Sequence, residues 1–239
     1  MTIINSSEYK NLFFAYALSE EVPSRGTIIL LDGLPSNPLS KNQLMKKLSE
    51  QDYDIFFPRY EGTWESGGRF LERAPSEAII EFIEMLKRGR NLENKKYKAG
   101  KVFLLGSSFG GGVALDIATK FPPNKICVVS PVISFRKVEG IESLGNHLKT
   151  SEVENYRFDS RDWQRLIEDK IWNLENCKII NPSNIMIIAG KDDDQIKEKD
   201  VTEFGKKNSI KVRVCDSGHI TLSKIPDSIL AEIIDFFSE

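Results

Sequence analysis

The chain has few residues of the kinds that form disulfide frameworks or metal sites. Its 239 residues include only three cysteines, Cys127, Cys177 and Cys215, and only two histidines. No two cysteines form a C-x-x-C pair, so we expect thiols in a reducing compartment, with no disulfide framework and no metal. The N-terminus also lacks a basic start followed by a long apolar run. Together these absences predict a cytoplasmic protein.

Long apolar runs and a strong net charge are lacking as well. No segment approaches the roughly 20 apolar residues that a membrane-spanning helix needs. The formal net charge is −2, which gives no broad attraction to nucleic acid or to an anionic membrane. Neither G-x-x-x-x-G-K-[ST] nor G-x-G-x-x-G occurs, so no phosphate or dinucleotide loop is indicated. The sequence predicts no nucleic-acid partner, no membrane span and no cofactor.

Short apolar runs alternate with helical patterns along the chain. The runs expected to form strands are 8–18, 26–32, 53–57, 102–105, 125–130, 184–189 and 210–214. Between them lie helical patterns, one capped at Ser40 and another ended by Gly205. This alternation predicts a single α/β domain over residues 1–239, with a mostly parallel central sheet and helices on both faces. Run 210–214 alternates apolar and charged residues, which is typical of an edge strand where a homodimer could form.

The stretch 101–121 holds the strongest functional motif. An apolar strand pattern passes without a linker into a helical pattern, and Gly106-Ser107-Ser108-Phe109-Gly110 lies between them. This is G-x-S-x-G, a pattern that by itself also fits an ordinary glycine-rich turn. With a strand before it and a helix after it, the motif predicts a nucleophile elbow that lifts the Ser108 hydroxyl above the sheet.

A base and an acid are available at the ends of later strands. His219 directly follows the last strand, whereas His147 lies in a polar stretch with no strand beside it. Three aspartates, Asp192, Asp193 and Asp194, directly follow the strand at 184–189. One of them is expected to orient His219, and the other two are expected to be solvated. The chain order Ser, Asp, His is the order found in α/β-hydrolases.

These motifs together resemble the α/β-hydrolase superfamily, in its small esterase and acyl-peptidase-like branch. The resemblance covers the chain from about Gly26 to the C-terminus and includes the elbow, the loop 59–67 and the Gly218-His219 pair. In that family the acid commonly lies three residues after a glycine, with an aliphatic residue three further on. Gly190, Asp193 and Ile196 have this spacing, which favours Asp193 over Asp192 as the acid.

The resemblance also implies an oxyanion hole made of two backbone N–H groups. One would belong to Phe109, which follows the nucleophile, and the other to Leu34, in the loop after the strand at 27–31. Relatives usually carry His-Gly in this loop, whereas this chain has Asp32-Gly33. A carboxylate that pointed inward would oppose the negative charge that the hole must stabilise.

An insertion at about 132–183 separates two strands and is expected to form a small helical lid. It contains Phe158, Trp163 and Trp172, which would line an apolar acyl pocket or simply pack the lid onto the sheet.

The sequence thus predicts a serine hydrolase that cleaves a carboxylic ester or related acyl bond of a small molecule. Its catalytic residues would be Ser108, Asp193 and His219. The alternatives are a peptidase or aminoacyl hydrolase, and a non-catalytic binding protein that keeps the fold.

Overall fold

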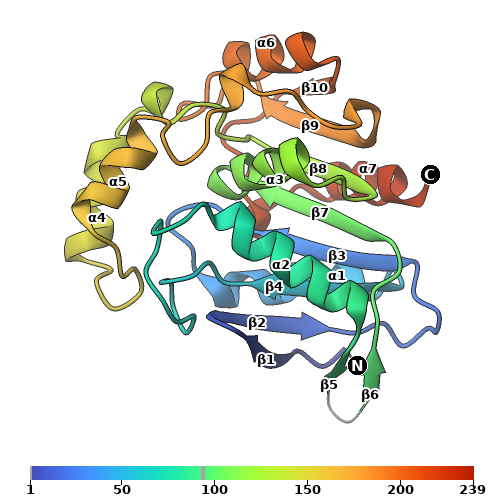
Figure 1. Cartoon of the computed structure of the whole chain (residues 1–239). Helices are drawn as coiled ribbons and strands as arrows, with labels where there is room; N and C mark the ends of the chain where they lie inside the picture. Colours follow the sequence, from blue (N-terminus) through green and yellow to red (C-terminus); the bar gives the residue numbers. More distant parts are fainter. Residues whose placement is uncertain (1, 93–94) are drawn as a thin grey trace.

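An eight-stranded sheet runs through the molecule in the order β1-β2-β4-β3-β7-β8-β9-β10 (Figure 1). The computed structural model describes residues 2–92 and 95–239. The strands of the sheet are β1 (Asn5–Tyr9), β2 (Leu12–Ala17), β3 (Gly26–Leu31), β4 (Tyr53–Pro58), β7 (Val102–Ser107), β8 (Lys125–Val129), β9 (Ile185–Gly190) and β10 (Lys211–Cys215). A separate hairpin is formed by β5 (Arg90–Leu92) and β6 (Lys95–Tyr97).

Six neighbouring strands of the sheet are parallel, as the alternating pattern predicts. Strands β4, β3, β7, β8, β9 and β10 pair in parallel, while β1 and β2 join one edge antiparallel. The apolar runs of β3 and β7 are buried along their whole length. Continuous apolar runs are typical of central parallel strands because both faces of such a sheet are covered.

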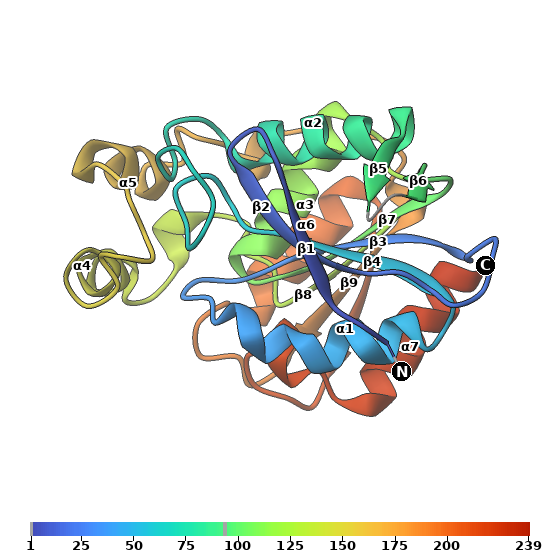
Figure 2. The same ribbon diagram turned by 90° about the horizontal axis from the view of Figure 1, so that it is seen from below.

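Helices cover both faces of the sheet (Figure 2). One face packs against α1 (Asn42–Ser49) and α7 (Asp227–Ser238), whose buried residues include Met45 and Ile233. The other packs against α2 (Pro75–Arg88), α3 (Phe109–Lys120) and α6 (Glu198–Asn208), with Phe82, Val113 and Phe204 in its core. The two cores therefore lie on opposite sides of the strands, and α3 is the most deeply buried of these helices, with every residue from Phe109 to Ala118 buried.

Two further helices lie within the segment that joins β8 to β9. They are α4 (Ile141–Thr150) and α5 (Ser160–Ile167), and they lie beside the end of the molecule toward which the parallel strands point (Figure 1). Asp159 caps α5, because its side chain accepts a hydrogen bond from the N–H of Arg161 at 2.8 Å. The predicted insertion at 132–183 is therefore helical and lies at the carboxyl edge of the parallel strands.

Three local predictions are wrong. Residues 8–18 form a hairpin of two strands, because the chain reverses at Lys10 with φ 51°. Ser40 lies inside a short 3-10 helix, Pro38–Lys41, and does not cap α1. Helix α6 continues past Gly205 to Asn208, and Gly205 has another cause: a Cβ there would lie 2.1 Å from Cγ2 of Val212. This glycine lets the helix approach strand β10.

Strand β10 lies at one edge of the sheet, as predicted, and is partly exposed along its length. The homodimer that this edge suggests stays a prediction. Across residues 2–92 and 95–239, no helix is both long and apolar enough to cross a membrane.

Packing between α4 and α5 gives a stability test at Gly145. A Cβ at this position would lie 2.2 Å from the indole nitrogen of the buried Trp163. We expect Gly145→Ala to lower the free energy of unfolding by about 1–3 kcal/mol through overpacking, although alanine is the better helix former. Thermal and urea unfolding would measure the change. Gly100→Ala is the matched control, because nothing lies within 4 Å of a Cβ there. A stabilised Gly145→Ala variant would contradict the packing.

Candidate active site

Ser108 makes the turn between β7 and α3. Its backbone has φ 51° and ψ −119°, a conformation that non-glycine residues rarely adopt. Gly110, two residues later, passes so close to β3 that a Cβ would lie 2.0 Å from the carbonyl oxygen of Leu31. The predicted elbow conformation is therefore present, and it places Ser108 at the N-terminus of α3, where developing negative charge is favoured.

Asp193 and His219 contact each other across neighbouring loops. Nδ1 of His219 lies 2.9 Å from Oδ2 of Asp193 and 3.1 Å from Oδ1. The side chain of His219 is 11% exposed and that of Asp193 is 1% exposed. Burial acts to raise the pKa of Asp193, but hydrogen bonds from His219 and from the N–H of Ile196 outweigh it and lower the pKa below its ordinary value. The carboxylate is thus held charged against the imidazole.

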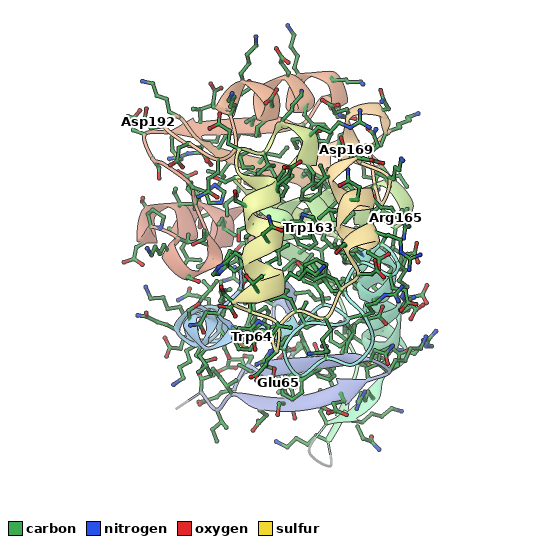
Figure 3. The ribbon with its side chains drawn as sticks, turned by 90° about the vertical axis from the view of Figure 1, so that its left-hand side faces the viewer. Trp64, Glu65, Trp163, Arg165, Asp169 and Asp192 are labelled. Atoms are coloured by element: carbon green, nitrogen blue, oxygen red, sulfur yellow. The ribbon has the colours of Figure 1, made fainter. Side chains whose placement is uncertain are left out.

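Asp192 points away from this contact. It is exposed, and Figure 3 places it at the margin of the molecule. Of the two aspartates weighed from the sequence, Asp193 is the one that meets His219. The other histidine, His147, is exposed on α4.

Two buried serines that the sequence analysis missed hold the loop of His219. Oγ of Ser130 accepts a hydrogen bond from the N–H of Ile220 at 3.1 Å, and Oγ of Ser107 accepts one from Leu222 at 3.2 Å. Both serines lie at the carboxyl ends of strands, β8 and β7. That placement was visible in the sequence, but their partners lie about 90 residues or more away.

Ser108 and His219 line one cavity of about 270 Å³. Polar and apolar surface contribute about equally to the rest of its wall, which includes Leu34, Pro35 and the polar side chains of Asp32, Asn37, Lys41, Gln195, Thr221 and Ser223. The cavity therefore brings Ser108 and His219 to the same space, and their catalytic roles stay predictions.

The aromatic residues of the insertion do not line this cavity. Trp172 packs against Phe109 and Phe135, with ring centroids 5.5 and 5.2 Å apart. Trp163 lies between α4 and α5 and contacts Phe158 (Figure 3). Of the two interpretations drawn from the sequence, the structure favours packing over an apolar acyl pocket.

The loop after β3 contains the predicted oxyanion donor. The N–H of Leu34 has no hydrogen-bond partner among the described residues, so it is free to bind a substrate oxygen. The second predicted donor, Phe109, is the first residue of α3, and first-turn N–H groups have no acceptor within their helix. Leu34 lines the same cavity as Ser108, and Phe109 directly follows Ser108 in the chain. Their role as oxyanion donors stays a prediction.

Two tyrosines that the sequence analysis did not identify hold the same loop. The hydroxyl of Tyr60 donates to the carbonyl oxygen of Asp32 at 3.0 Å. Burial raises the pKa of Tyr60 well above its ordinary value, so the hydroxyl keeps its proton. Tyr156, from the insertion, accepts a hydrogen bond from the N–H of Ser36 at 2.7 Å. No short-range pattern marks either tyrosine, because each partner is distant in sequence.

The carboxylate of Asp32, in the loop of the predicted oxyanion donor, is paired with other groups of the chain. Its side chain is buried, accepts the N–H of Gly33 at 2.9 Å and forms an ion pair with Lys41. The sequence analysis identified the Asp32 substitution but not its partner. Across the part of the chain that the structure describes, no group of three or more His, Cys, Asp or Glu side chains is arranged to hold a metal ion.

The parallel sheet, the Ser108 elbow and the Asp193–His219 contact define an α/β-hydrolase. The family model Hydrolase_4, described as serine aminopeptidase, S33, matches residues 22–178. The chain therefore belongs to this hydrolase family. No curated protein matches the sequence.

Solved structures agree on the fold. An esterase of Pyrococcus furiosus has a TM-score of 0.71 and 17% identity, over 98% of this chain and 92% of its own. A predicted CIB-like hydrolase of Thermoplasma acidophilum has a TM-score of 0.63 and 17% identity, over 100% and 99%. A serine hydrolase without lid from Xanthomonas campestris has a TM-score of 0.63 and 13% identity, over 99% and 91%. At such identities the likeness establishes the fold alone.

The Asp193–His219 contact predicts a sharp difference between neighbouring aspartates. We expect Asp193→Asn to lower kcat by about 10⁴-fold, because the amide no longer holds the imidazole in the orientation that accepts a proton. Asp192→Asn is the matched control and should stay within about twofold of wild type, as expected for an exposed residue without a role. Steady-state kinetics on an ester substrate would measure both. Equal losses of kcat in the two variants would contradict the role assigned to Asp193.

Proposed function

We propose that the protein cleaves a carboxylic ester, or a related acyl bond, of a small molecule through an acyl-enzyme. The observation that carries this proposal is the cavity shared by Ser108 and His219, whose ring is bonded to Asp193. Membership of a hydrolase family supports the reaction class. The esterase named among the structural neighbours supports the fold only.

In the first step, Oγ of Ser108 bonds to the substrate carbonyl carbon, and its proton passes to Nε2 of His219. Asp193 accepts a hydrogen bond from Nδ1 and stabilises the imidazolium that forms. The carbonyl oxygen becomes an oxyanion, which the N–H groups of Leu34 and Phe109 would bind. Loss of one such donor typically costs about 100- to 1000-fold in rate.

The tetrahedral intermediate then collapses to an acyl-enzyme, which water hydrolyses in a second stage. His219 returns its proton to the leaving alcohol as the ester bond breaks, which leaves the acyl group on Ser108. Water gives a proton to His219 and attacks the acyl carbon, and the carboxylic acid leaves as Ser108 regains its proton. The cycle consumes one water and restores all three side chains.

The cavity favours short acyl chains. Its volume of about 270 Å³ makes it a small site. Polar side chains such as Asn37, Gln195 and Thr221 line much of it. A long alkyl chain would leave these groups without hydrogen-bond partners, which opposes binding.

We propose that the insertion at 132–183 is a fixed wall beside the site. Its segment around Tyr156 pairs with Thr63. The backbone N–H of Arg157 donates a hydrogen bond to the carbonyl oxygen of Gly62 at 2.8 Å, and the carbonyl oxygen of Arg157 accepts one from the N–H of Phe70 at 2.7 Å. These bonds hold the insertion on the loop after β4. Opening it as a flap would break all of them together.

Aminoacyl or peptide hydrolysis is the second candidate, and the description of the matched family favours it. An aminopeptidase needs a carboxylate to bind the substrate α-ammonium group. Among the described residues lining the cavity, Asp32 is the sole acid, and Lys41 already neutralises it. The ester proposal is therefore the stronger of the two.

The first test compares p-nitrophenyl esters from acetate to octanoate. We expect kcat/KM to be highest for acetate or butyrate and about tenfold lower or more for octanoate, a loss of about 1.4 kcal/mol of transition-state binding. Ser108→Ala should lower kcat by about 10⁶-fold. A fluorophosphonate should label wild type at Ser108 and leave the variant unlabelled. No turnover and no labelling of wild type would favour a binding protein instead.

Aminoacyl p-nitroanilides separate the two candidate substrates. We expect kcat/KM for alanine p-nitroanilide to be at least about 100-fold below that for p-nitrophenyl butyrate, in large part because an anilide is intrinsically less reactive than an activated ester. Recognition of the α-ammonium group is measured by comparing the free-amine anilide with its N-acetylated form. N-acetylation of the anilide should change the rate little, because no free carboxylate faces the ammonium group. A free-amine anilide that outpaces both its acetylated form and the ester would establish the aminoacyl candidate.

A further inference from the structure

The loop that carries the proposed oxyanion donor is folded around a buried ion pair. The side chains of Asp32 and Lys41 are 6% and 3% exposed and contact each other as carboxylate and ammonium. Both line the cavity of Ser108 and His219. A pair so deeply buried is kept only when its hydrogen bonds are satisfied, because desolvation of two charges is costly.

Every hydrogen-bonding proton of the Lys41 ammonium has an acceptor. Besides Asp32, Nζ donates to the carbonyl oxygen of Asn37 at 3.2 Å and to Oγ of Ser40 at 3.1 Å. An ammonium has three protons, so none remains for a substrate. Lys41 is therefore bonded entirely to its own loop, and a role in binding substrate is not supported.

The carboxylate of Asp32 is equally occupied. Oδ1 accepts the N–H of Gly33 at 2.9 Å, while Oδ2 accepts the hydroxyl of Ser36 and meets Lys41. The side chain thus binds both the start and the end of the turn 32–36. The N–H of Leu34, within this turn, is the group left free.

The turn lies directly beside the nucleophile. A Cβ at Gly33 would lie 3.1 Å from Cβ and 3.7 Å from Oγ of Ser108. The side chain of Asp32, the residue before Gly33, lines the same cavity as Ser108, and its full charge would repel an oxyanion formed there. The ammonium of Lys41 cancels that charge while leaving the hydrogen bonds of Asp32 to the turn intact.

We propose that Lys41 is a positioning residue of the active site, which neutralises Asp32 and thereby lets the 32–36 turn present the Leu34 N–H to an oxyanion. This inference rests on the proposed function. It assigns Lys41 an effect on the transition state and none on substrate binding.

The test removes the charge of Lys41 and then the charge of Asp32. We expect Lys41→Met to lower kcat for p-nitrophenyl butyrate by about 10- to 100-fold, somewhat less than the loss of a whole oxyanion donor. KM should change by less than about twofold, since uniform binding is unaffected. The rate constant for fluorophosphonate labelling of Ser108 should fall in the same proportion as kcat.

The double variant Asp32→Asn/Lys41→Met should recover most of that loss, to within about fivefold of wild type. Its amide carries no charge but still accepts a hydrogen bond from Gly33, so removal of both charges is expected to be less harmful than removal of one. Lys47→Met is the matched control, because Lys47 forms an exposed ion pair with Asp227 and does not line the cavity of Ser108 and His219. It should leave kcat unchanged.

Three results would overturn the inference. They are a Lys41→Met variant with wild-type kcat and labelling, a folded double variant as slow as Lys41→Met, and a loss that lies in KM alone. If Lys41→Met does not fold, the double variant Asp32→Asn/Lys41→Met decides: the inference expects at most about a fivefold loss of kcat, and a loss of 10-fold or more contradicts it. Wild type that is neither active nor labelled would refute the proposed function itself, whereas labelled wild type with an equally labelled Lys41→Met would refute only the role of Lys41.

Discussion

The architecture of the site depends on how closely strand β3 and helix α3 approach each other. At Gly110 no Cβ fits, because it would lie 2.0 Å from the carbonyl oxygen of Leu31. The chain must therefore turn from β7 into α3 within one residue, and Ser108 does so with φ 51°. The same approach brings the turn after β3 against the elbow, with Gly33 beside Ser108. Backbone strain at one residue is thus the condition for placing a nucleophile next to an oxyanion donor.

Phe109, the residue after Ser108, holds the turn in place through contacts of its ring. The ring of Phe109 packs against Tyr60 and Phe70 from the loop after β4, with centroids 5.3 and 5.7 Å apart. It also packs against Phe135 and Trp172 from the insertion. Aromatic contacts of this kind add stabilisation beyond buried area. A displacement of the insertion would therefore reach the elbow through Phe109, which supports a fixed wall over a moving flap.

The sequence alone predicted the elements whose cause is local. Continuous apolar runs identified β3 and β7, and G-x-S-x-G between strand and helix identified the elbow at Ser108. Features that depend on distant partners were missed or misread. Gly205 was interpreted as a helix end because its real reason, the approach of Val212, is a contact between α6 and β10. Lys41 carried no motif, since its importance comes from burial against Asp32, nine residues away in sequence.

Two buried carboxylates can share one small site because each has its own partner. Asp32 is paired with an ammonium whose protons are all bonded within the loop, so this pair has no proton to exchange with a substrate. Asp193 is paired with the imidazole of His219, which has a second ring nitrogen for proton transfer. In the proposed mechanism the two pairs therefore have different roles: one shapes the oxyanion loop, and the other moves protons. In the proposed mechanism His219 must be neutral to accept the proton of Ser108, so Asp193 keeps its charge behind the ring, whereas Lys41 cancels the charge of Asp32 within the loop. The proposed preference for small neutral esters therefore depends on the uncharged groups of the cavity wall.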